Sequence, residues 1–314
     1  MMIFRIFHPL ARIAGAALLL LALGACATQG ETAISGMEAQ YSAPINFDRD
    51  GRPTAEVRIN DRAQFAFAID TAAQRTAISG TVIDALALQP DPEMQAQVHG
   101  VGGAATVPMY RLASLELGGR RLEDGYYLRP VGAHAGNSPH DGILGHDMIA
   151  TGRIVFDFAG RTVRFGAVSS EGLGDSLPAT VMFGGFFLVD ISIDGVVTTA
   201  LIDTGASTSF ANAALRDALG LAEGEGGLQA VTEVMGVTRE AMRLETGFTG
   251  DVEIGAVRLA DAAIVFTDSP VFATIGLTDR PAIVLGSDVL RRLPGFALDY
   301  EAHTFRHFAS AGRS

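Results

Sequence analysis

Residues 67–73 read FAIDTAA and residues 200–206 read ALIDTGA, so one apolar run ending in Asp-Thr occurs twice in the chain. In each half, two aliphatic residues and a glycine follow later, at 143–145 and 284–286. A motif that recurs in the same order indicates an internal repeat. We therefore expect Asp70 and Asp203 to face each other across a pseudo-twofold axis.

The repeat extends well beyond this motif. Both aspartates are preceded by an alternating stretch around a turn, and both halves close on two strand-like segments, a pattern typical of β-hairpins. The matching pairs are 56–65 with 189–198, 115–119 with 252–256, 144–148 with 285–289, and 154–165 with 296–305. This duplication predicts a mainly β chain with two homologous lobes, 41–172 and 173–314.

Composition supports this fold class and excludes some partners. The 314 residues include 37 glycines, and the helical stretches are short, at 80–88, 211–219 and 287–293. A formal net charge of −12 and the lack of a basic stripe argue against nucleic-acid binding, which requires a basic surface. The acidity is better explained as a contribution to solubility.

The N-terminus is expected to be a targeting segment. Residues 1–25 combine Arg5 and Arg12 with an apolar run, 13–23, that is shorter than the roughly 20 residues of a membrane-spanning helix. The run ends in Leu-Gly-Ala before Cys26, the only cysteine, and this resembles the lipobox of bacterial lipoproteins. That resemblance implies a lipid anchor on Cys26, a tether over 26–40 and a periplasm-facing place on the outer membrane, since no aspartate follows Cys26. The alternative is an ordinary cleaved signal with an incidental cysteine.

Two carboxylates that meet have a chemical use. They cannot both ionise cheaply, so they share one proton over a broad pH range. The ionised carboxylate can then draw a proton from water, while the protonated one hydrogen-bonds the carbonyl under attack. Peptide hydrolysis would proceed in this way without a metal or a cofactor.

At these residues the chain resembles the aspartic peptidases of the pepsin and retropepsin group. The resemblance covers most of residues 41–310 and implies two pepsin/retropepsin-like β-barrel lobes in one chain, as in bacterial periplasmic members. Asp70 and Asp203 match the catalytic aspartates, and a duplicated chain makes a monomer the expected state. The matching support positions are Thr71 and Thr204, which cross-link the loops, Thr76 and Ser209 downstream, and Gly145 and Gly286 beneath each loop.

The first motif departs from the family pattern. Ala72 stands where glycine is usual and where Gly205 stands in the second copy. A glycine is often required for close approach of backbone. The candidate flap residues are Gly100, Val101, Gly102 and Gly103 in the first half, with Met235 and Gly236 in the second.

The resemblance implies an aspartic endopeptidase acting on peptide or protein. A catalytically weak or inactive relative that binds extended peptide or an envelope protein is the alternative, favoured by Ala72 and the weak flap pattern.

Other sites find less support in the sequence. His134, His140, Asp141, His146 and Asp147 could suggest a metal site, but their spacing does not match a known one, and we expect none. Asp157 and Asp299 are expected to be surface charges. Gly-x-Ser-x-Gly and phosphate-loop motifs do not occur.

Overall fold

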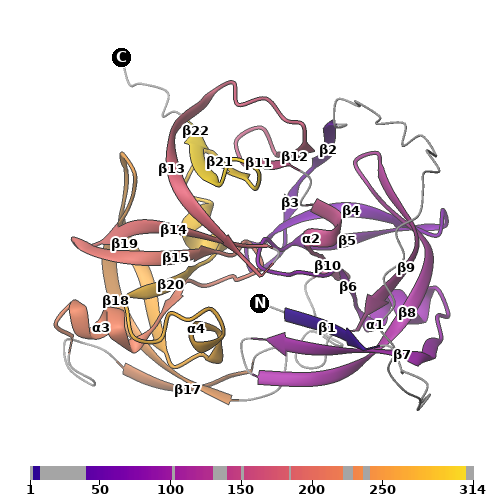
Figure 1. The fold of residues 1–314 in the computed structure, drawn as a ribbon, viewed down its shortest axis with the longest axis horizontal. Coiled ribbons are helices and arrows are strands. Elements are labelled where there is room, and N and C mark those ends of the chain that lie inside the picture. The colour runs from indigo at the N-terminus through magenta and orange to yellow at the C-terminus, as the bar shows by residue number, and fades with distance from the viewer. Residues whose placement is uncertain are drawn as a thin grey trace, which may run out of the picture.

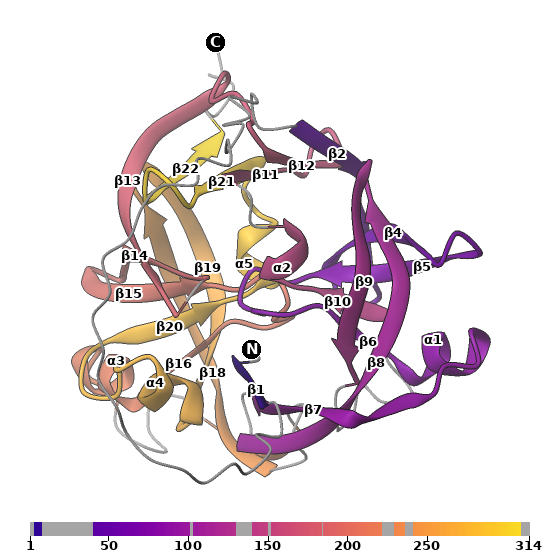
Figure 2. The same ribbon diagram turned by 45° about the vertical axis from the view of Figure 1, so that its right-hand side comes forward.

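Two closed β-barrels, one from each half of the chain, lie side by side (Figures 1 and 2). The computed structural model describes residues 3–7, 40–100, 103–129, 140–149, 152–183, 185–221, 229–235 and 241–308. The expected mainly β, two-lobe architecture is confirmed.

The first half contains twelve strands and two short helices. They are β1 (Ile3–Phe7), β2 (Gln40–Pro44), β3 (Asn46–Phe47), β4 (Pro53–Ile59), β5 (Ala63–Ile69), β6 (Ala77–Ile78), α1 (Gly80–Ala85), β7 (Pro90–Gly100), β8 (Gly103–Leu117), β9 (Arg120–Leu128), β10 (Gly142–Leu144), α2 (His146–Ile149), β11 (Arg153–Asp157) and β12 (Thr162–Gly166).

The second half repeats this order. Its elements are β13 (Leu173–Met182), β14 (Phe186–Ile193), β15 (Val196–Ile202), β16 (Phe210–Ala211), α3 (Ala213–Ala218), β17 (Gln229–Met235), β18 (Ala241–Ile254), β19 (Val257–Thr267), α4 (Pro270–Thr274), β20 (Ala282–Leu285), α5 (Ser287–Leu290), β21 (Gly295–Asp299) and β22 (Thr304–Phe308).

Each barrel closes through one extra strand pairing. In the first half the order β8-β9-β6-β10-β5-β4 is closed by pairing of β8 with β4. In the second half the order β18-β19-β16-β20-β15-β14 is closed by pairing of β18 with β14. Closure removes the open edges that a sheet of this size would otherwise expose.

The hairpins before the aspartates form as the sequence predicts. Asn60 and Asp61 take φ values of 51° and 55°, and Asp194 and Gly195 take 46° and 83°. Positive φ at both central residues defines a type I′ turn, which matches the twist of the flanking strands. These turns set the register in which β5 and β15 deliver the aspartates to the middle of the molecule.

A six-stranded sheet joins the two lobes, in the order β13-β22-β21-β11-β12-β2. Its central pair, β11 and β21, comes from equivalent positions of the two halves and runs antiparallel, with Val155 opposite Ala297. The expectation that Asp299 is a surface charge is wrong. Asp299 is only 5% exposed, and its Oδ2 accepts a 2.9 Å hydrogen bond from Arg153 Nε across that pair.

The helices are shorter than the sequence predicts. α1 ends at Ala85 because Ala87 turns into the left-handed region, at φ 49°. α3 begins after Asn212, whose side chain accepts a 3.0 Å bond from Leu215 N, and it precedes Gly220 at φ 71°. α2 and α4 were not expected, since four or five residues carry too little helical periodicity to detect.

Each lobe extends one long hairpin below the centre of the molecule, β7–β8 from the first and β17–β18 from the second, and the two point towards each other (Figures 1 and 2). Gly100 pairs with Gly103 at the end of the first hairpin, and Met235 pairs with Ala241 in the second. Val101, Gly102 and Gly236 lie outside the described residues.

Little of the predicted leader is described. Ile3–Phe7 form β1, which pairs antiparallel with β7, whereas the leader was expected to contribute nothing to the fold. The pairing is understandable because β7 is an edge strand that offers free backbone groups. Cys26 lies outside the described residues, and within the described part no helix is long and apolar enough to cross a membrane.

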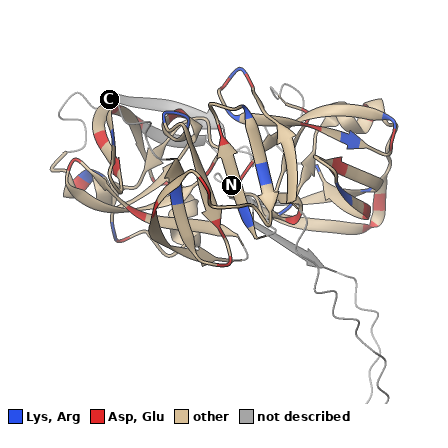
Figure 3. Cartoon of the chain, turned by 90° about the horizontal axis from the view of Figure 1, so that it is seen from above, with Lys and Arg blue, Asp and Glu red and all other residues tan. Residues whose placement is uncertain are grey.

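Acidic and basic residues are interspersed over both lobes (Figure 3).

Candidate active site

Asp70 and Asp203 meet where the two lobes join. Each follows the last residue of its strand, β5 or β15, and each is buried, with exposures of 5% and 1%. Their backbone N–H groups donate 3.0 Å bonds to Leu144 O and Leu285 O, on the strands that run parallel alongside. The aspartates therefore stand on barrel walls rather than on free loops.

The two threonines link the aspartate loops reciprocally. Thr71 Oγ1 donates to Ile202 O at 2.8 Å, and Thr204 Oγ1 donates to Ile69 O at 2.6 Å. Each hydroxyl also accepts from the other threonine's backbone N–H, at 3.2 and 3.1 Å. All four bonds are buried and cross between the lobes, so they fix the distance between the carboxylates.

The two carboxylates differ in their surroundings. Asp203 Oδ1 accepts two backbone bonds, from Gly205 N at 2.9 Å and Ala206 N at 3.0 Å. Asp70 Oδ1 accepts one, from Ala72 N at 2.8 Å. Burial, together with the negative charge of Asp203, raises the pKa of Asp70 to about 7. N–H donors stabilise a carboxylate, and Asp70 accepts fewer of them, so the hydrogen bonds and the raised pKa both favour the proton of the pair on Asp70.

Ala72 and Gly205 are not equivalent in space. A Cβ on Gly205 would lie 2.3 Å from Cγ and Oδ2 of Asp70, so only glycine fits there. Ala72 does not have a positive φ, and its methyl group is fully buried in an apolar cluster with Phe186 and Leu201 of the second lobe. The alanine that departs from the family pattern is thus accommodated without backbone strain.

A further brace, repeated in both halves, holds each loop to the strand beneath it. Thr76 Oγ1 donates to Asp147 Oδ1 at 2.7 Å and accepts from Gly145 N at 3.1 Å. In the second half Ser209 Oγ donates to Asp288 Oδ1 at 2.7 Å and accepts from Gly286 N at 2.9 Å.

Gly145 and Gly286 are needed because a Cβ there would lie 2.4 Å from Arg75 C and 2.9 Å from Ala206 O. Asp147 and Asp288 were not predicted to hold the aspartate loops, although both stand two residues after the glycine of their half.

Arg52 was also missed, and its contacts cross the lobe boundary. Its Nε donates a 2.8 Å bond to Gly205 O, and Nη1 pairs with Asp48 Oδ2 at 3.1 Å. The residue is 8% exposed. No sequence signal points to it, because the repeat has Gly185 at the equivalent place.

The histidine and aspartate residues considered for a metal do not form a site in the described part of the chain. There, no group of three or more His, Cys, Asp or Glu side chains is placed to hold a metal ion. His146 packs edge-on against Tyr300, with ring centroids 4.6 Å apart. His134 is outside the described residues.

Two stretches, 55–148 and 189–289, each match the profile of an aspartyl protease family. Together they cover more than half of the chain, and each contains one of the two paired aspartates and the threonine that follows it. The chain belongs to the aspartyl protease family. A search of curated proteins found no match. As a family member the chain has a protease-type fold with one Asp-Thr loop per lobe.

Proposed function

We propose that the protein is an aspartic-type endopeptidase whose two lobes supply one carboxylate each. The observation that carries this proposal is the asymmetric buried pair, in which the pKa of Asp70 is raised to about 7 beside Asp203. Such a pair holds one proton between two carboxylates, which is the state that both activates water and donates a hydrogen bond. Within the family, that chemistry is the cleavage of peptide bonds.

The hydrogen bonds favour a particular division of roles. Asp203, the carboxylate that accepts more backbone hydrogen bonds, accepts a proton from the attacking water. As the water oxygen bonds to the carbonyl carbon, Asp70 donates its proton to the carbonyl oxygen, and that carbon becomes a gem-diol centre with two hydroxyl groups. Return of a proton to the amide nitrogen then releases the amine and the new carboxyl group, so no covalent intermediate forms.

The alternative, a binding protein without catalysis, has weaker support. It depended on Ala72, whose methyl group packs in an unstrained loop, and on the flap pattern. Both lobes extend a long hairpin, so both can supply strand partners to an extended peptide. We therefore propose catalysis and treat loss of activity as the result that would revive the alternative.

The first test is cleavage of a peptide library by the 27–314 fragment from pH 3 to pH 7.5, with Asp203→Asn alongside. We expect cleavage that Asp203→Asn abolishes. Insensitivity to pepstatin alone would not contradict the proposal, because clefts of this group vary. A folded fragment that cleaves nothing across this range would contradict it.

We also propose that the chain is a periplasm-facing lipoprotein, anchored in the outer membrane through Cys26. The support is the leader of residues 1–25, the LGAC sequence and the single cysteine. Metabolic labelling with a fatty acid should label the wild-type chain and not Cys26→Ala. Labelling that persists in Cys26→Ala, or a mature chain that retains residues 1–25, would contradict the anchor.

A further inference from the structure

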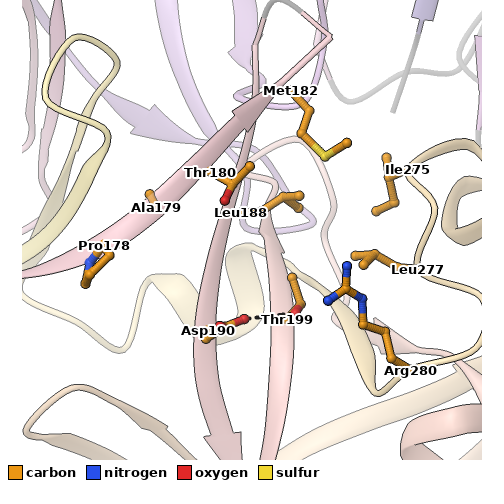
Figure 4. A pocket seen from close by; sticks show the side chains of 10 residues that line it. All are labelled: Pro178, Ala179, Thr180, Met182, Leu188, Asp190, Thr199, Ile275, Leu277 and Arg280. Atoms are coloured by element: carbon orange, nitrogen blue, oxygen red, sulfur yellow. Dashed lines mark hydrogen bonds between the residues drawn. The ribbon is translucent and has the colours of Figure 1, made fainter.

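A hollow of about 350 Å³ with mixed polar and apolar walls opens on the second lobe, between β13, β14, β15 and the loop that follows α4 (Figure 4). Its apolar walls are Met182, Leu188, Ile275 and Leu277. The last three are buried, with exposures of 5%, 3% and 2%, so they form a fixed floor. No part of the mechanism above uses this space.

The floor of the hollow packs into the same apolar cluster as the first aspartate loop. Leu188, Ile275 and Leu277 belong to the same apolar cluster as Ala72, and Met182 packs against that cluster. The next residue, Phe183, is 53% exposed, and its carbonyl accepts a hydrogen bond from Gln74 of the first aspartate loop. A peptide that lies across the dyad beside Phe183 would pass the Met182 end of the hollow.

The strand that carries Asp203 also lines the hollow. Thr199, a wall residue, precedes Asp203 by four positions on β15, which corresponds to about 13 Å along an extended strand. An extended substrate advances by a similar rise per residue. The hollow thus lies within the span of about four substrate residues from the dyad, so side chains up to four residues from the scissile bond are the candidates to occupy it.

One charged group on the rim is free to bind a ligand. The guanidinium of Arg280 lies beside Leu277 at the edge of the hollow (Figure 4) and makes no ion pair or hydrogen bond with the described part of the chain. Asp190, the acidic wall residue, accepts a 2.9 Å bond from Thr199 Oγ1. Arg280 can therefore pair with an acceptor on a bound ligand.

We propose that this hollow is a substrate subsite that selects a glutamate side chain, with Arg280 as the specificity-determining residue. The methylene stem would lie on Leu277 and Ile275, and the carboxylate would accept two N–H bonds from the planar guanidinium. A glutamine of the same shape lacks the charge. The inference rests on the proposed peptide cleft and adds to it a class of substrate, peptides with an acidic residue near the cleavage site.

The test compares peptides that carry Glu or Gln at one position at a time, up to four residues on either side of the scissile bond. Wild-type protein should prefer Glu at one position by about fivefold in kcat/KM, the scale of a solvent-exposed ion pair. Arg280→Glu should lose that preference at that position. Arg62→Glu, at the remote β4–β5 turn, makes the same charge change and should keep it.

Binding separates this inference from the proposed catalysis. The same peptides, with a reduced and uncleavable bond, are titrated into the Asp203→Asn protein with and without Arg280→Glu, and anisotropy is measured. A Glu preference that depends on Arg280 supports the subsite even if no cleavage is ever seen. A wild-type protein without a Glu preference, or a preference that Arg280→Glu leaves unchanged, overturns it.

Discussion

Ala72 and Gly205 occupy matching positions in the repeat, yet only one of them must be glycine. We expect Gly205→Ala to reduce kcat/KM by about 10³-fold or more, because the new methyl group would displace the carboxyl of Asp70. Ala72→Gly should leave kcat/KM close to that of the wild type and lower the free energy of unfolding by about 1–2 kcal/mol, through lost burial and added chain entropy. Peptide cleavage and urea unfolding of both variants check this.

The raised pKa of Asp70 has a consequence for folding. In the unfolded chain this carboxyl ionises near pH 3.8, whereas in the folded protein it keeps its proton to about pH 7. Between these values the folded state binds more protons, so stability falls as the pH rises, by up to about 1.4 kcal/mol per pH unit.

Asp70→Asn should flatten that slope and be more stable than the wild type at pH 7. Urea unfolding at several pH values between 4 and 8 measures the slope. An equal slope in Asp70→Asn would show that another group causes it. In the wild type, cleavage should decline above about pH 7, as Asp70 loses the proton that the carbonyl needs.

At the scale of elements, Arg52, the residue just before β4, hydrogen-bonds to the second aspartate loop. Arg52→Gln should remove the bond to Gly205 O and lower the free energy of unfolding by about 1–3 kcal/mol, the range for a hydrogen bond from a charged group. It should also lower kcat, because the loop that carries Asp203 loses its outer support. Arg62→Gln is the matched control, since Arg62 is exposed on the turn between β4 and β5. Equal effects of the two substitutions would show that the hydrogen bond from Arg52 does not support the loop that carries Asp203.

The elements that the sequence predicts well are those whose signal is local. The hairpins around Asn60 and Asp194 and the strands before each aspartate follow from alternation and turn residues. Contacts between segments far apart in the sequence could not be predicted in this way. They are the hydrogen bonds of Asp147 and Asp288 to the aspartate loops, the bond from Arg52 to Gly205 and the buried pair of Asp299 with Arg153. The sequence also could not show that the Ala72 methyl group is accommodated, because the side chains around it come from the other lobe.

At the scale of the whole molecule, both halves of the site belong to one chain. The barrels share a six-stranded sheet, and four buried bonds between Thr71 and Thr204 loops cross the boundary. A second copy of the chain is therefore unnecessary for the dyad. We expect the 27–314 fragment to elute as a monomer on size exclusion and to cleave peptides at a rate proportional to its concentration.

The most direct test of the dyad mixes two inactive variants. Asp70→Asn and Asp203→Asn should each reduce kcat/KM by about 10³-fold or more, because each removes one of the two groups that move protons. Their equimolar mixture should remain equally inactive, since no molecule in it holds both carboxylates. Activity of either variant near the wild-type level would contradict the shared-proton mechanism, and activity restored by mixing would show that the site forms between two chains.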